Sequence, residues 1–189
     1  MGRVRTVLTR PLVLGALAVL LVVAGAGLYW FQPWKLWQDE TVREALPTAA
    51  APSSPSDPST SPSGEASASP ATPQTLASGE LISHEHPTSG TVKLLRLADG
   101  SYTLRLESLD TSNGPDLRVL LTDAPVKEGR DGWHVFDDGK YVSLGKLKGN
   151  KGDQNYALPS DIKPADFTSV SIWCDRFDVS FGAAELRQA

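Results

Sequence analysis

Residues 168–182 read TSVSIWCDRFDVSFG, and their apolar side chains alternate as those of a buried strand do. The apolar residues of the first phase are Val170, Ile172 and Cys174. The phase then slips by one residue, and the apolar residues of the second phase are Phe177, Val179 and Phe181. One continuous strand cannot do this, because a one-residue slip moves every side chain to the opposite face. The stretch therefore predicts two strand segments joined by a bend or bulge at Asp175 and Arg176, with Cys174 as the last inward-facing residue before it.

Similar short apolar stretches, separated by turn signals, run through residues 79–189. Asp99-Gly100 is a hairpin signal because glycine adopts positive φ at little cost. No long amphipathic helix interrupts the pattern, and residues 164–168 form at most a short helical turn. We therefore predict that residues 79–189 form one all-β domain, an antiparallel β-sandwich or barrel-like fold.

The N-terminal part has the pattern of a membrane anchor. Residues 1–10 are basic, and residues 11–31 carry no charge, which is long enough to cross a hydrocarbon core of about 30 Å at about 1.5 Å per residue. Aromatic residues and then acidic residues follow the span. This order predicts a single-pass signal-anchor helix in the cell membrane, with a cytoplasmic N-terminal tail and an extracellular C-terminal domain. The alternative is a cleaved signal peptide with its site at residues 24–26, which would export the domain equally well.

Residues 32–78 connect the predicted anchor to the β domain. After a juxtamembrane segment the composition changes to Ala, Pro, Ser and Thr, and residues 46–78 hold half of the 14 prolines in the chain. Such a sequence has too little apolar surface to offset the entropy of ordering it. We predict a disordered linker that spaces the domain from the membrane.

Composition excludes several classes of function. The formal net charge of −4 argues against a nucleic-acid partner, because neutralising phosphates requires a clustered basic surface. The single cysteine excludes an internal disulfide and a paired-cysteine metal site. The glycine-rich residues 145–152 lack the order of a phosphate-binding loop and precede no expected helix.

Four sequence blocks in this order resemble the DM13 domain, a small extracellular β-rich module. The blocks are GEL at 79–81 with His86 and Gly90, GPDLRV at 114–119, LGKLKGNKGDQ at 144–154 with Tyr156, Leu158 and Pro159, and SVSIWC at 169–174 with Phe177 and FG at 181–182. The anchor and linker resemble those of many actinobacterial surface proteins. The resemblance implies an electron-transfer or redox module with the cysteine at position 174 as its active group.

Cys174 is accordingly the candidate redox thiol. A thiol is reactive when nearby cations stabilise its thiolate and inert when it is buried among apolar groups. Arg176 lies two residues away and His86 can approach in space, whereas strand phase places the thiol inward beside Ile172. Dithiol chemistry would need a second thiol from a partner, because the chain has only one.

A metal centre is a second way to carry electrons. His84 and His86 point to the same side if their segment is extended, and with Cys174 they would form the His2Cys ligand set of a blue-copper site. The usual axial methionine is missing, because the only methionine is Met1. We therefore consider copper or another metal as a cofactor at these three residues.

Two further residues are candidates for binding. Asp116 follows a Gly-Pro turn, where it binds a ligand or caps its own loop. Trp173 contacts a partner if its face of the strand is exposed and belongs to the core if that face is covered. Two functions therefore remain open. One is a redox module acting through Cys174 with a redox partner, and the other is a non-catalytic surface module that recognises a partner protein or envelope component through Trp173 or residues 145–152.

Overall fold

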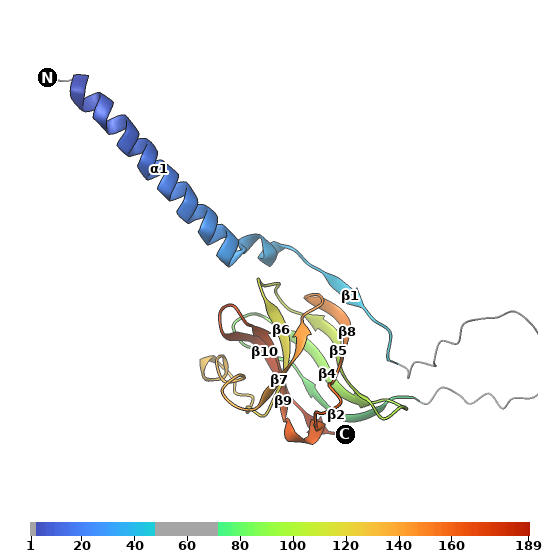
Figure 1. Cartoon of the computed structure of the whole chain (residues 1–189). Helices are drawn as coiled ribbons and strands as arrows, with labels where there is room; N and C mark the ends of the chain where they lie inside the picture. Colours follow the sequence, from blue (N-terminus) through green and yellow to red (C-terminus); the bar gives the residue numbers. More distant parts are fainter. Residues whose placement is uncertain (1–2, 48–71) are drawn as a thin grey trace, which may run out of the picture.

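The computed structural model describes residues 3–47 and 72–189, and it consists of an N-terminal helix and a two-layer β domain (Figure 1). Most of the predicted linker, residues 48–71, lies outside the described residues. The helical elements are α1 (Arg3–Phe31) and the 3-10 helices η1 (Pro33–Trp37), η2 (Arg130–Gly132) and η3 (Pro164–Asp166). The strands are β1 (Thr41–Arg43), β2 (Gln74–Glu80), β3 (Ile82–Ser83), β4 (Ser89–Arg96), β5 (Tyr102–Asp110), β6 (Leu117–Thr122), β7 (Tyr141–Lys146), β8 (Lys151–Ala157), β9 (Ser169–Cys174), β10 (Val179–Glu185) and β11 (Arg187–Gln188).

The predicted β-sandwich is confirmed. One sheet has the strand order β1-β8-β5-β4-β2-β11 and the other has the order β3-β10-β9-β6-β7. All pairings are antiparallel except that of β1 with β8. Apolar residues from both sheets, such as Leu104 and Ile172, are fully buried in a common core between them. The expected hairpin at Gly100 is also present, because this residue has φ +84 in the turn between β4 and β5.

The connection after Cys174 differs from the predicted bend or bulge. Residues 175–178 form a turn that reverses the chain, and β9 and β10 then pair antiparallel with Cys174 opposite Val179. Phe177 belongs to this turn and is 38% exposed, so it is not part of a second strand phase. A turn that reverses the chain and a one-residue bulge both shift the alternation of apolar and polar residues. The sequence pattern alone therefore could not distinguish a turn from a bulge.

The outer face of β9 is covered as well as its inner face. Every residue of β9 is buried. The segment 123–140 passes over the outer face and forms a second, smaller apolar cluster there. The buried members of this cluster are Leu120, Ala124, Phe136, Trp173 and Ala183. Trp173 is therefore a core residue, which decides between its two predicted roles.

The β domain also begins earlier than residue 79, where the sequence placed its start. β2 starts at Gln74, and β1 comes from the juxtamembrane segment and pairs with the edge strand β8, with Val42 opposite Gly152. The two sheets thus recruit residues on both sides of the linker. Only residues 38–40 separate η1 from β1, so these residues and not the linker set the distance between α1 and the domain.

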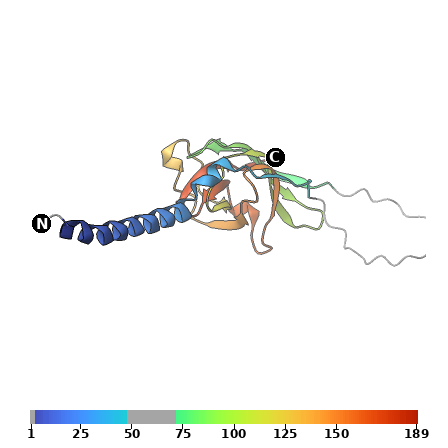
Figure 2. The ribbon, with the colours of Figure 1, turned by 90° about the horizontal axis from the view of Figure 1, so that it is seen from above.

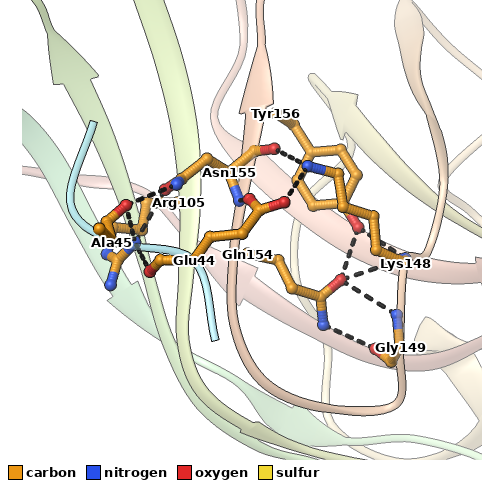
Figure 3. A network of polar contacts seen from close by, with 8 residues as sticks. All are labelled: Glu44, Ala45, Arg105, Lys148, Gly149, Gln154, Asn155 and Tyr156. Carbon is orange, nitrogen blue, oxygen red and sulfur yellow. Dashed lines mark hydrogen bonds and ion pairs between the residues drawn. The ribbon is translucent and has the colours of Figure 1, made fainter. Parts of the chain in front are cut away.

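A polar network fixes β1 and the residues after it (Figure 3). The Glu44 carboxylate accepts hydrogen bonds from Lys148 Nζ at 2.7 Å and from the backbone N–H of Asn155 at 2.6 Å. The buried Arg105 donates to the carbonyl oxygens of Glu44 and Ala45. Burial alone would raise the pKa of Glu44, but these donors and the Lys148 charge hold it below its ordinary value. The carboxylate is therefore a specific partner of the domain and not a solvated linker residue.

α1 leaves the domain at one end and projects away from it (Figure 2). Its segment Pro11–Phe31 is long and apolar enough to cross a membrane, and none of its apolar window is buried inside the protein. Among the described residues, contacts between α1 and the domain come from the C-terminal end of the helix. Arg176 Nη1 donates to the carbonyl oxygen of Trp30, and the ring of Phe177 stacks on that of Phe31 at 5.5 Å between centroids.

Candidate functional site

Cys174 lies at the end of β9, on the side of the domain that contacts α1. Its side chain is fully buried and belongs to the main core. Its neighbours across the sheet are Leu117 of β6 and Val179 of β10. The inward direction predicted from the sequence is therefore correct, and the resting thiol is shielded from solvent.

The electrostatic surroundings of the thiol are mixed. Burial raises the pKa of Cys174, because a thiolate is poorly solvated in the core. The backbone N–H groups of Phe177, Arg176 and Asp116 act in the opposite direction. The side chain of Arg176 is turned toward the carbonyl of Trp30. The effect of burial is the larger one, so the pKa of Cys174 is raised and the folded protein keeps the thiol protonated.

The loop that contains Asp116 closes over this end of β9. The backbone N–H of Asp175 donates to the carbonyl oxygen of Asp116 at 3.0 Å, which ties the loop to the β9–β10 turn. The Asp116 carboxylate lies 3.5 Å from Arg118 and 3.6 Å from Lys146. These contacts give Asp116 a structural role in the loop, and its predicted role in ligand binding stays a prediction.

His86 faces the same region as Cys174. Its ring lies against the ring of the core residue Phe181, with 4.0 Å between the centroids. Burial lowers the pKa of His86, and the nearby Glu85 carboxylate opposes this effect. The imidazole is therefore neutral at neutral pH. Apart from the contact of Nε2 with Glu85 at 3.8 Å, its ring nitrogens have no polar partner within residues 3–47 and 72–189.

His84 does not join His86 and Cys174, contrary to the ligand set expected from the sequence. Its Nδ1 lies 2.8 Å from the Ser180 hydroxyl and its Nε2 lies 3.1 Å from the carbonyl oxygen of Lys127. Its ring stacks on Phe136, in the cluster on the outer face of the sheet. The segment after β3 bends and is not extended, so the two histidines lie on different faces. Among the described residues, no three His, Cys, Asp or Glu side chains come together as metal ligands.

The contacts of His84 predict a pH-dependent stability. The carbonyl oxygen of Lys127 can only accept a hydrogen bond, so Nε2 of His84 carries the proton and Nδ1 accepts from the Ser180 hydroxyl. Burial lowers the pKa of His84 from 6.5. Below about pH 6.5 the unfolded chain binds more protons than the folded chain, so the free energy of unfolding falls as the pH falls. Urea unfolding at about pH 7.5 and about pH 5.5 should show this loss, and it should be smaller in His84→Gln. An equal loss in the variant would contradict the assignment.

A cavity lies between the end of α1 and the Cys174 side of the domain. It has a volume of about 220 Å³ and is lined mainly by aromatic and proline side chains. We call it the α1-side pocket, and its main lining residues are Phe31, Pro33, His86, Pro115, Phe177 and Phe181. Sequence reasoning did not find this pocket, because its walls come from four separate segments and no spacing rule connects them.

The structure places the two regions from which a binding module was predicted, and that function stays a prediction. Trp173 is buried in the second apolar cluster, on the outer face of β9. The glycine-rich residues 145–152 pack against the juxtamembrane segment, because a Cβ at Gly149 or Gly152 would collide with the backbone of that segment. This part of the chain therefore holds β1 in place, which the sequence did not reveal.

The comparison with known families agrees with this arrangement. A family model described as Electron transfer DM13 matches residues 80–186, which is more than half of the chain. No curated protein and no solved structure is significantly similar to the chain. The match covers Cys174, both predicted histidines and all strands from β3 to β10. The chain therefore belongs to the family described as Electron transfer DM13.

Proposed function

We propose that this protein is a single-pass membrane protein whose β domain transfers electrons on the outer side of the cell membrane. The family description supports the redox role, and the exposed apolar surface of α1 supports the anchor. The basic residues before the span and the acidic residues after it support a cytoplasmic N-terminus. Because β1 is part of the domain, the Cys174 side of the domain would lie at the membrane surface.

Cys174 is the group that we propose to carry the redox chemistry. The family description supports this, together with the place of Cys174, the single cysteine of the sequence, at the end of β9 next to the turn that contacts α1. Joining the Cys174 thiol to a partner thiol forms one disulfide and releases two protons and two electrons to a two-electron acceptor. The reaction requires the loop at Asp116 and the β9–β10 turn to open, since the resting thiol is buried.

The rate of thiol exchange tests this role directly. We expect Cys174 in the full-length protein in detergent micelles to react with glutathione disulfide through a local opening. The matched control is the double variant Cys174→Ser, Val170→Cys, which places a thiol at a fully buried position of the same strand. We expect an opening free energy for Cys174 at least about 1.4 kcal/mol below that of the control, which is about tenfold in rate.

The dependence of the exchange rate on urea concentration distinguishes local opening from global unfolding. A local opening exposes little surface, so the exchange rate of Cys174 should depend only weakly on low urea concentrations, whereas that of the control should follow global unfolding. Exchange of Cys174 only by global unfolding would make it a structural core cysteine. Loss of the folded domain on formation of the mixed disulfide would lead to the same conclusion.

A further inference from the structure

The shape of the α1-side pocket limits what it can hold. A cavity of about 150 Å³ lined by apolar side chains is enough to bind benzene, and the α1-side pocket measures about 220 Å³. Phe31 and Phe177 form one wall with their rings stacked at an interplanar angle of 25°. His86 and Phe181 form another aromatic wall, with their ring centroids 4.0 Å apart. Flat walls of this kind favour a planar ring over a branched aliphatic chain.

The pocket lining also includes polar residues, Gln32, Lys35, Glu85 and His86, and the ring of His86 can recognise a ligand. The neutral imidazole of His86 has one donor and one acceptor nitrogen. Within the described part of the chain its ring makes only the 3.8 Å contact with Glu85. Pockets for small ligands combine apolar walls with a small number of polar groups that fix orientation. The ring carbonyl of a planar ligand would accept the imidazole hydrogen.

The position of the pocket indicates where the ligand comes from. Phe31 is the last residue of α1, and it ends the uncharged segment Pro11–Phe31, none of whose apolar window is buried inside the protein. The apolar wall of the pocket is therefore continuous with the surface that would face lipid, and Arg176 and Phe177 hold the two together. A molecule dissolved in the membrane reaches the pocket along this surface without crossing water.

We infer that the α1-side pocket binds the ring of a lipid-soluble quinone, with His86 donating a hydrogen bond to one ring carbonyl. A role of this ligand as the electron acceptor rests on the proposed function of Cys174. Binding of the ring does not, because the pocket walls do not include the Cys174 side chain.

The test uses the full-length protein in lipid nanodiscs and 2-methyl-1,4-naphthoquinone as the probe, with empty nanodiscs measured in parallel. We expect saturable binding at one site per chain. His86→Leu should weaken binding about tenfold by removing one hydrogen bond. The hydrocarbon 1,4-dimethylnaphthalene has the same ring system without carbonyls, so His86→Leu should weaken its binding much less than that of the quinone, because only a wall contact and no hydrogen bond is lost.

Two further variants make the result specific. Phe177→Ala removes part of one wall and should weaken both probes, whereas Tyr141→Ala changes an exposed aromatic residue of β7 and should weaken neither. Cys174→Ser should bind the quinone as the wild type does, so a failure of the redox role leaves the binding result intact. Binding that never exceeds the empty nanodiscs would overturn the inference, as would equal quinone affinity in the wild type and His86→Leu.

Discussion

Replacing Trp173 with alanine is expected to lower the free energy of unfolding by about 3–5 kcal/mol. The indole is 2% exposed and packs edge-on against Phe136 in the cluster on the outer face of the second sheet. Its removal deletes buried apolar surface and leaves a cavity that the surrounding strands cannot fill. Urea unfolding of the full-length protein in detergent micelles, followed by far-ultraviolet circular dichroism, measures the change.

Tyr141→Ala is the matched control, because this aromatic side chain is 46% exposed at the edge strand β7. A change at such a surface position is expected to stay within about 0.5 kcal/mol. If Trp173→Ala lowered the free energy of unfolding as little as this control, the segment 123–140 would not cover β9 as described. Trp173 would then again be a candidate for contact with a partner.

Replacing Gly152 with alanine is expected to detach β1 from the sheet. Gly152 has φ +94, and a Cβ on it would collide with the carbonyl oxygen of Val42, the residue that it faces in β1. Moving β1 away relieves the collision at the loss of a short three-residue pairing. Because proteolysis of a strand requires local opening, we expect trypsin to cut after Arg43 at least about tenfold faster than in the wild type.

Gly145→Ala is the control for the backbone effect alone. Gly145 also has positive φ, at +115, but a Cβ there meets nothing within 4 Å. Both variants therefore strain the backbone, and only Gly152→Ala disturbs β1. Equal cleavage after Arg43 in the two variants would show that β1 is not held by this contact. The expected difference matters for function, because β1 keeps the Cys174 side of the domain beside the end of α1.

The local patterns in the sequence predicted several features of the fold correctly. Alternation around Cys174 predicted its inward direction, and Asp99-Gly100 predicted a hairpin, because both depend on neighbours in the chain. The break after Cys174 was also predicted at the right place, but as a bend or bulge and not as a turn that reverses the chain. A reversal and a slip give the same local alternation, and only pairing with a distant strand tells them apart.

The candidate site was predicted less completely. His84 and His86 would point to the same face only if their segment were extended. The chain bends after β3, and the ring of His84 stacks on Phe136. The juxtamembrane strand β1 has only three residues, which is too short for a periodic signal. Its place in the sheet depends on close approach to Gly149 and Gly152 and on the ion pair between Glu44 and Lys148.

The sequence by itself determined that an uncharged helix of membrane-spanning length precedes a β domain of the DM13 family with one inward-facing thiol. These features follow from composition and from the period of neighbouring side chains. Only the tertiary structure decided that Trp173 is covered, that β1 joins the domain, and that a pocket forms between the end of α1 and the domain. Each of these depends on contacts between segments far apart in the chain, and such contacts leave no periodic trace in either segment.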